Sequence, residues 1–234
     1  MWLRNQRVQK FLGGGALERV AIRGVSALEM LGLRTHKDSA TLSLIRRVRR
    51  ERRWLVTSNE AFLVHSLTRA QIKLPGEIAE VGVYQGGTAR MICEVKGTKT
   101  LHLCDTFEGL PEPTSSDGKV HTGSQYACSL ESVQGYLKDY PNVVFHKGLF
   151  PDSVAAAEDV KGSTYCFAHF DVDLYQSTLD CLKFFYPRMV TGGVMLSHDY
   201  SILAGVSKAF AEFLADKPED LIELPTTQCM VIKR

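Results

Sequence analysis

The chain has 234 residues, 44% of them hydrophobic and 23% charged, which are the proportions of an ordinary globular protein with one large core. No apolar run approaches the 18 residues needed to cross a membrane, which excludes a transmembrane segment. The net charge of +2 is unevenly distributed, because residues 1–60 carry 13 basic and 5 acidic side chains. The basic residues peak in "RRVRRERR" at 46–53, typical of a solvated helix face or of a docking surface for phosphate or acidic lipid. Aromatic residues are not interleaved there, so no nucleic-acid partner is expected.

Residues 1–72 are predicted to form a basic, helical N-terminal arm or lid, followed by a domain at 73–234. The short, glycine-rich "FLGGGAL" near the start of the chain is not expected to be a signal peptide. A second helical region is predicted over 41–72, in which Ser58 of "SNEAF" is the cap candidate. The arm is expected to pack on a neighbouring subunit in a homo-oligomer.

From residue 77 onward, short apolar runs alternate with amphipathic segments. The sequence predicts strands at 77–83, 100–107, 143–148, 165–173 and 192–200, and helices at 88–96, 129–140, 177–189 and 205–216. A weak helix is expected after "FPDSV", and extended segments at 221–233. Because most of the strands are uniformly apolar, they predict an α/β fold with a mostly parallel, doubly wound sheet covered by helices on both faces.

Six cysteines occur at irregular spacings, and no two of them form a CxxC pair. This pattern predicts neither a disulfide framework nor a zinc site. A reducing, cytoplasmic location is therefore expected.

Polar side chains follow several of the predicted strands. They are Glu80, Asp105, Asp171, His198 and Asp199. In a parallel sheet, ligands bind at the carboxyl ends of the strands, near the point where the strand order reverses. We therefore expect these side chains to converge on one crevice.

The first of the loops, "EVGVYQGGTAR", is rich in glycine. Gly82 allows a tight turn, and Gly86 and Gly87 are expected to let a ligand approach the start of the next helix. The spacing is neither the G-x-G-x-x-G of dinucleotide sites nor the G-K-[ST] of a P-loop. Asp105 lies where Rossmann-type domains hold ribose hydroxyls. Ribose recognition without a pyrophosphate loop favours S-adenosylmethionine, with Thr88 near its amino-acid end.

Asp171, His198 and Asp199 offer oxygen and nitrogen donors at the ends of two strands. Such donors suit Mg²⁺ or Mn²⁺ in an open site. A metal there would lower the pKa of a substrate hydroxyl, and a carboxylate beside it would accept the proton. The alternative is that Asp171 and His198 hydrogen-bond across the crevice without a metal.

Five motifs occur in order: "PGEIAEVGVYQGGTAR", "LCDTFEGLP", "KGLFPDS", "HFDVDLYQSTLDCLKFFYPRMVTGGVMLSHDYS" and "GVSKAFAEF". Over about residues 45–234 the chain thereby resembles the macrocin O-methyltransferase family, which includes the aminocoumarin sugar enzymes. The resemblance implies a Rossmann-like class I S-adenosylmethionine methyltransferase. It implies Mg²⁺-dependent methyl transfer to a hydroxyl of a small-molecule acceptor, often a sugar of a natural product.

By the same resemblance, Asp171 is implied to be a metal ligand and the general base, with His198 and Asp199 completing the metal set. The motif implies Glu80, Gly82, Gly86, Thr88 and Asp105 as cofactor-binding residues. Family members commonly carry two acidic residues before the tyrosine, whereas this chain has "HDY". The departure leaves open which metal is bound, and whether any is.

Two other functions fit part of the pattern. Asp171 and Asp173 form a D-x-D motif, as in metal-dependent glycosyltransferases, although the glycine loop and Asp105 would then have no purpose. A non-catalytic binding module on the same fold would differ from an enzyme in being indifferent to a chelator or to Asp171→Asn.

Overall fold

The structure is a computed structural model that describes residues 16–117, 121–155 and 157–234. The predictions for residues 1–15, and for 118–120 in the loop that follows the second strand, lie outside the described residues. No helix among the described residues is long and apolar enough to span a membrane.

The centre of the fold is a seven-stranded sheet in the order β3-β2-β1-β4-β5-β7-β6. Its strands are β1 (Glu77–Val81), β2 (Leu101–Asp105), β3 (Val143–Lys147), β4 (Tyr165–Phe170), β5 (Met189–Ser197), β6 (Ile222–Glu223) and β7 (Cys229–Ile232). The first five strands are parallel, and β7 is antiparallel to both β5 and β6. The strand order reverses between β1 and β4, which places the expected ligand crevice at their carboxyl ends.

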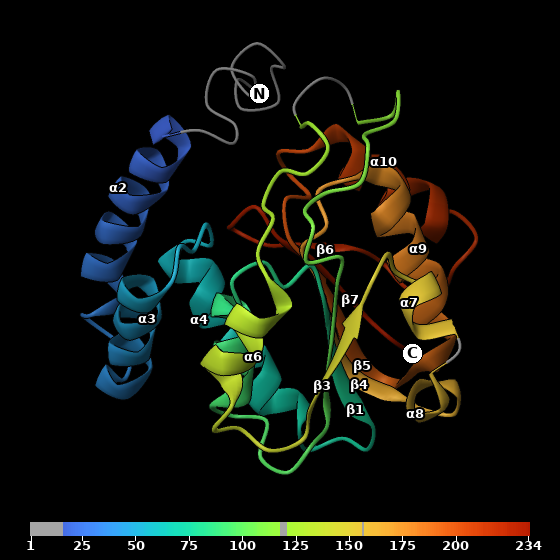
Figure 1. Ribbon diagram of the computed structural model, residues 1–234, viewed down its shortest axis with the longest axis horizontal. Coiled ribbons are helices and arrows are strands. Elements are labelled where there is room, and N and C mark those ends of the chain that lie inside the picture. The colour runs from blue at the N-terminus through green and yellow to red at the C-terminus, as the bar shows by residue number, and fades with distance from the viewer. Residues whose placement is uncertain (1–15, 118–120, 156) are drawn as a thin grey trace.

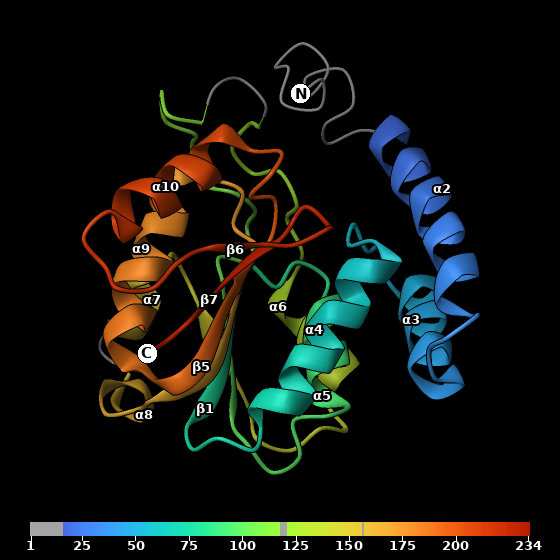
Figure 2. The same ribbon diagram turned by 180° about the vertical axis from the view of Figure 1, so that it is seen from behind.

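Helices cover both faces of this sheet, as Figures 1 and 2 show. One face carries α4 (Ser58–Gln71), α5 (Gly87–Cys93) and α6 (Leu130–Leu137); the other carries α7 (Asp152–Ala155), α8 (Glu158–Lys161), α9 (Tyr175–Phe185) and α10 (Ala204–Leu214). Alternate residues of β1 point to opposite faces of the sheet. Ile78 packs in the apolar core under α4, α5 and α6, whereas Ala79 and Val81 pack in the core under α7 to α10. The predicted doubly wound α/β fold is confirmed.

The N-terminal part of the described chain contains α2 (Ala16–Leu33) and α3 (Ser39–Glu51) in addition to α4. A third apolar cluster joins α3 to α4 and α5 through Ile45, Ala61 and Met91. Because α4 also packs against the sheet through Val64, it belongs to the same packed body as the strands. The division of the chain at residue 72 stays a prediction.

The helical region predicted over 41–72 consists of two helices, and the helix start expected at "SNEAF" is confirmed, since α3 ends at Glu51 and α4 begins at Ser58. The cap of α4 is Thr57 and not Ser58: the Thr57 amide donates to Glu60 at 2.8 Å. Ser58 instead has a buried hydroxyl that donates to the carbonyl of Ser26 in α2. Ser129 does cap α6, as predicted, by accepting from the Ser132 amide.

Candidate active site

A cavity of about 310 Å³ opens at the carboxyl ends of β1, β2, β4 and β5. Eight of the residues singled out from the sequence line it: Gly82, Gly87, Thr88, Asp105, Asp171, Asp173, His198 and Asp199. Glu80 and Gly86 are not among the lining residues. Most of the side chains that were expected to converge therefore lie around one cavity at the carboxyl ends of the strands.

The glycine loop is shaped by contacts within the protein. Gly82 has φ +85°, and a side chain there would overlap the carbonyl oxygen of Asp171, so the turn and the close approach of β4 both require glycine. A Cβ on Gly86 would lie 2.9 Å from Val133, and one on Gly87 would lie 2.7 Å from Trp54. These two glycines make room for side chains of the protein, and Gly87 also lines the cavity. That they admit a ligand stays a prediction.

Asp105, at the end of β2, holds the glycine loop in place. Its Oδ2 accepts from the amides of Val83 at 2.7 Å and Tyr84 at 2.9 Å, and its Oδ1 accepts from the amide of Phe107 at 2.7 Å. The carboxylate still lines the cavity. It therefore fixes the loops after two neighbouring strands while it faces the space where a ligand would lie.

Thr88, in the first turn of α5, is positioned by a residue that the sequence analysis missed. The indole Nε1 of Trp54 donates to its Oγ1 at 3.0 Å, and both side chains are buried and line the cavity. Because the oxygen accepts from Trp54, the hydroxyl proton of Thr88 is available to a ligand. The sequence shows only that a tryptophan precedes α4. It does not show that this side chain contacts Thr88.

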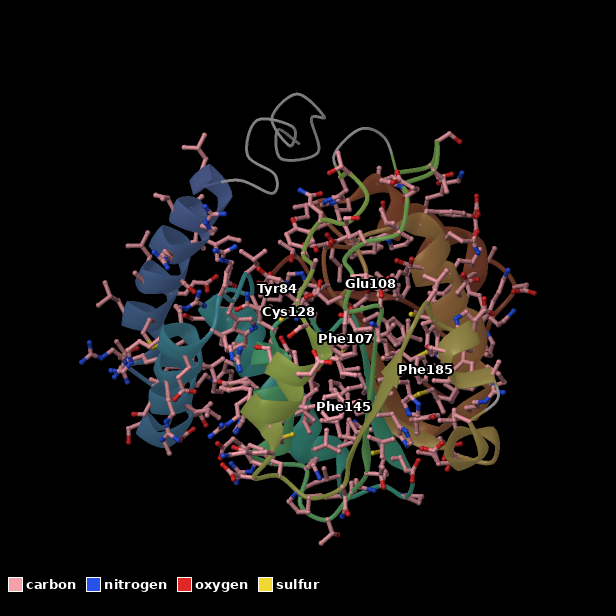
Figure 3. The ribbon with its side chains drawn as sticks, in the orientation of Figure 1. Tyr84, Phe107, Glu108, Cys128, Phe145 and Phe185 are labelled. Atoms are coloured by element: carbon pink, nitrogen blue, oxygen red, sulfur yellow. The ribbon has the colours of Figure 1, made fainter. Side chains whose placement is uncertain are left out.

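Non-glycine residues with positive φ follow four of the parallel strands: Tyr84 (47°), Phe107 (56°), Asp173 (57°) and Asp199 (58°). Tyr84, Asp173 and Asp199 line the cavity, and Figure 3 labels Tyr84 and Phe107. Such conformations are costly outside glycine and gather at functional sites. The backbone at the carboxyl ends of these strands therefore adopts uncommon conformations at three residues whose side chains line the cavity.

The three predicted metal ligands come together. The Nδ1 of His198 lies 3.5 Å from Asp171 Oδ1 and 3.1 Å from Asp199 Oδ2, and one donor atom from each residue falls within a group 4.8 Å across. Asp173, the second residue of the D-x-D motif, is not part of this group. The arrangement differs from a D-x-D site, in which both aspartates hold the same cation.

The charges in this group are unbalanced. Burial raises the pKa of Asp171 and of Asp199, and nearby Asp173 raises both further. Burial alone would lower the pKa of His198, but Asp199, Asp171 and Glu60 outweigh it and raise that pKa. The raised pKa values of Asp171 and Asp199 reflect the cost of ionising two buried carboxyl groups close together. A divalent cation would offset that cost, so these donors fit one.

Glu60, which was not predicted as a site residue, binds the far side of His198. Its Oε2 lies 3.2 Å from the Nε2 of His198, and its Oε1 accepts from the hydroxyl of Thr227 at 2.6 Å. A carboxylate behind a ligating histidine fixes the tautomer and the orientation of the ring. The sequence indicates that Glu60 lies in the first turn of a helix. It does not indicate the contact of Glu60 with the histidine that follows β5.

Glu80 is fully buried beneath the glycine loop, in register with His169 of β4. Its Oε1 lies 3.3 Å from the Nδ1 of His169. Burial raises the pKa of Glu80 well above its usual value and lowers that of His169 to about 4, so burial favours the uncharged form of each side chain. The pair lies in the core beneath the loop, and the cofactor contact expected of Glu80 stays a prediction.

Curated relatives are similar in sequence to part of this chain. One from Streptomyces olivaceus, 8-demethyl-8-(2,3-dimethoxy-alpha-L-rhamnosyl)-tetracenomycin-C 4'-O-methyltransferase, is 30% identical over 55% of this chain and 54% of its own length. Demethyldecarbamoylnovobiocin O-methyltransferase from Streptomyces niveus is 28% identical over 64% of this chain and 63% of its own. The chain thus spans roughly half to two thirds of the length of the curated relatives it matches.

Solved structures share the fold. The O-methyltransferase NovP superimposes with a TM-score of 0.64 at 24% identity, covering 77% of this chain and 81% of that chain. The calicheamicin methyltransferase CalS11 gives 0.66 at 20% identity, covering 88% and 91%. TomG from Streptomyces achromogenes, solved with S-adenosylmethionine, gives 0.62 at 15% identity, covering 91% and 98%. The fold is therefore that of the class I S-adenosylmethionine O-methyltransferases.

A family model described as macrocin O-methyltransferase (TylF) matches residues 63–229, which include β1 to β6, the loops after β1, β2, β4 and β5, and the Asp171–His198–Asp199 group, but not Trp54 or Glu60. The match extends over more than half of the chain and covers most of the elements that build the site. The chain belongs to the macrocin O-methyltransferase family.

Proposed function

We propose that the protein is an O-methyltransferase that moves the methyl group of S-adenosylmethionine to a hydroxyl of a small molecule or glycoconjugate. The observation that carries the proposal is that one cavity joins Asp105 and Thr88 at one end of the strand edge to Asp171, His198 and Asp199 at the other. Family membership and the shared fold support this reading over the glycosyltransferase alternative.

The glycine-loop side of the cavity suits an adenosine ligand that carries an amino acid. Asp105 presents a carboxylate where ribose hydroxyls are held in this class of fold. The hydroxyl of Thr88, oriented by Trp54, is placed to donate to the ligand's carboxylate. The loop lacks a phosphate cradle, in keeping with a cofactor without phosphates.

On the other side, Asp171 is the proposed proton acceptor. Its side chain is 28% exposed in the cavity, and burial raises its pKa. A carboxylate with a raised pKa accepts a hydroxyl proton more readily than a free aspartate does. The methyl group then passes directly from sulfur to oxygen, so the chain's main tasks are to align the two atoms and to exclude water.

Asp171, His198 and Asp199 would hold Mg²⁺ or Mn²⁺, which, when bound, lowers the pKa of an acceptor hydroxyl. Glu60 would keep the Nε2 of His198 occupied, so that Nδ1 faces the two aspartates. These residues would remain arranged around the acceptor hydroxyl throughout the reaction.

We propose a sugar as the acceptor, because the name of the Streptomyces olivaceus relative places its reaction on a rhamnosyl compound. The test combines binding and turnover. Calorimetry would measure S-adenosylhomocysteine binding with EDTA present, and transfer of tritiated methyl groups would then be followed to a panel of rhamnosides with Mg²⁺ or Mn²⁺.

We expect Asp171→Asn to retain S-adenosylhomocysteine binding and to lose transfer, as EDTA does in the wild type. Asp139→Asn, an exposed carboxylate after α6, is the matched control and should behave as the wild type. Absence of S-adenosylhomocysteine binding would contradict the assignment, and transfer that survives both EDTA and Asp171→Asn would contradict the metal and the base.

We also propose that α2 mediates a homo-oligomer. Leu17, Val20, Leu28 and Leu31 are between 49% and 71% exposed and lie on one face of this helix. Most of the exposed large hydrophobic residues in the described chain are on α2, and such a stripe is typical of an interface. Sedimentation of the wild type and of Leu28→Glu tests this: the variant should be smaller, and an unchanged mass would count against α2.

A further inference from the structure

A second group of possible metal ligands lies outside the cavity, on the sheet face covered by α7 to α10. It consists of His102 on β2, His146 on the edge strand β3 and Asp159 on α8. Both imidazole side chains are buried, at 2% and 7% exposure, while Asp159 is 48% exposed. Figure 1 shows α8 beside the lower end of the sheet.

The distances among the three donor atoms match a metal site. His102 Nδ1 and His146 Nε2 are 3.0 Å apart, and Asp159 Oδ2 lies 4.0 Å from each of them. The point equidistant from all three atoms lies about 2.2 Å from each, close to the lengths of zinc bonds to histidine and aspartate. An ion would therefore fit without moving the backbone, although both rings must turn to aim their lone pairs at it.

A fourth residue prepares His102 for this role. Glu77 Oε2 lies 2.8 Å from the Nε2 of His102, on the side of the ring opposite the group. Because a carboxylate accepts the proton of that nitrogen, the Nδ1 of His102 carries the lone pair that faces His146. A carboxylate hydrogen-bonded to the far nitrogen is the usual support of a ligating histidine.

His146 is also suited to ligation. Its side chain is only 7% exposed, and its Nε2 faces both His102 Nδ1 and Asp159 Oδ2. Because Glu77 accepts from the Nε2 of His102, we infer that the Nε2–H of His146 is the donor to His102 Nδ1. An ion would take the place of that bond, and the proton would move to the Nδ1 of the His146 ring. The exposed side of Asp159 provides a path for the ion and room for a water as fourth ligand.

We propose that His102, His146 and Asp159 bind a transition metal ion of the zinc type, separately from the Asp171–His198–Asp199 group. Two nitrogens and one carboxylate favour zinc over magnesium, which prefers an all-oxygen shell. The ion would tie the short helix α8 to the edge of the sheet. Its role would be structural, since none of the three residues lines the cavity.

The test is a zinc titration of EDTA-treated, dialysed protein by calorimetry, combined with the visible spectrum of the Co²⁺ form. The background is Asp171→Asn with Asp199→Asn, which removes two ligands of the other group. One equivalent of zinc should bind to this background, and Co²⁺ should give the intense bands of a four-coordinate site. Asp159→Asn and His146→Gln should each lower zinc affinity at least tenfold and abolish those bands.

His36→Gln changes an exposed histidine outside the group and is the control, with affinity and spectrum expected to match the background. Asp159→Asn tests the site without disturbing the core, because the Asp159 side chain is exposed. The unfolding midpoint of this variant in EDTA should equal that of the background protein. If the background binds no zinc, or if Asp159→Asn and His146→Gln bind zinc as tightly as the background does, the proposal is wrong.

Discussion

Arg52 and Ser132 join α3 to α6 through two hydrogen bonds: Nη1 donates to the Ser132 hydroxyl and Nη2 to its carbonyl oxygen, each at 2.9 Å. The guanidinium also lies 4.2 Å from the ring centre of Tyr136. Part of the basic segment 46–53 is thus neither a solvated helix face nor a docking surface, because this arginine is committed to contacts inside the protein.

Arg52→Ala should therefore lower the free energy of unfolding by about 1–3 kcal/mol, since it removes charge-assisted hydrogen bonds and a stacked contact. Arg52→Lys should not restore the loss, because an ammonium cannot reproduce the paired donors. Arg46→Ala, at an exposed position of the same segment, should stay within about 0.5 kcal/mol. Urea unfolding measures the free energy of unfolding of the three variants. Equal losses for Arg46→Ala and Arg52→Ala would contradict the role given to the Arg52 contacts.

Glu60→Gln should weaken the binding of Mn²⁺ about 10- to 100-fold, because the histidine that faces Asp171 and Asp199 loses the carboxylate that orients it. The substitution keeps the shape of the side chain and its hydrogen bond from Thr227. Calorimetry with Mn²⁺ measures the affinity, and Glu131→Gln at an exposed position of α6 serves as the control. Unchanged affinity in Glu60→Gln would show that the ring is held by other contacts.

Two glycines in helices should respond to alanine in opposite ways. At Gly87 the new Cβ would lie 2.7 Å from Trp54, whereas at Gly135 it would meet no atom within 4 Å. Gly87→Ala should therefore destabilise the fold by about 1–3 kcal/mol and weaken S-adenosylhomocysteine binding, since it displaces a cavity residue. Gly135→Ala should stabilise α6 by about 0.5–1 kcal/mol. Calorimetry and thermal unfolding compare the pair, and a neutral Gly87→Ala would contradict the contact.

Stability at acidic pH should depend on Glu219. Burial alone would raise its pKa, but hydrogen bonds from Lys233 at 2.6 Å and Tyr186 at 2.6 Å outweigh burial and lower the pKa from 4.5 to about 2. A carboxyl whose pKa is lower in the folded state stabilises the protein above pH 4.5, and this contribution disappears as the pH falls from 4.5 to 2.

Glu219→Gln should therefore be clearly less stable than the wild type at pH 7, and the gap should narrow below pH 4.5. Unfolding in urea at several pH values between 7 and 3 measures it. Asp220→Asn is the control, because that side chain is 93% exposed. A gap that stays constant with pH would mean that Glu219 acts through packing and not through its charge.

Much of this fold is readable from the sequence, because apolar runs such as "YCFAHF" separated by amphipathic helices admit few arrangements. The convergence of Asp171, His198 and Asp199, the proposed metal ligands, could be predicted for a related reason: they follow neighbouring strands, and parallel strands bring their carboxyl ends together. The start of α4 at Ser58 was predicted, but the end of α3 was not, since "RRWLVTS" carries no strong breaker and its Trp54 continues an apolar pattern.

Contacts between distant parts of the chain could not be predicted from local pattern. Glu60 has the signature of a capping residue, and nothing near it in the sequence points to His198 or Thr227. Gly86 and Gly87 suggested a ligand because glycines are common at phosphate loops, yet Val133 and Trp54 occupy the space beside them. In each case the missing information is the identity of a side chain that arrives from another element.

The bonds of Glu60 also bear on how the protein is made. The ribosome completes α4 early, whereas Thr227, whose hydroxyl binds the same carboxylate, follows almost all of the sheet. The loops after β1 and β2 are tied together by Asp105 through residues of the first half of the chain, although the first of them also packs against Asp171 and Val133. A nascent chain stalled before residue 227 would contain β1 to β5 but would lack one of the groups that fix Glu60 behind His198. The orientation of Glu60 therefore depends on one of the last segments to be synthesised.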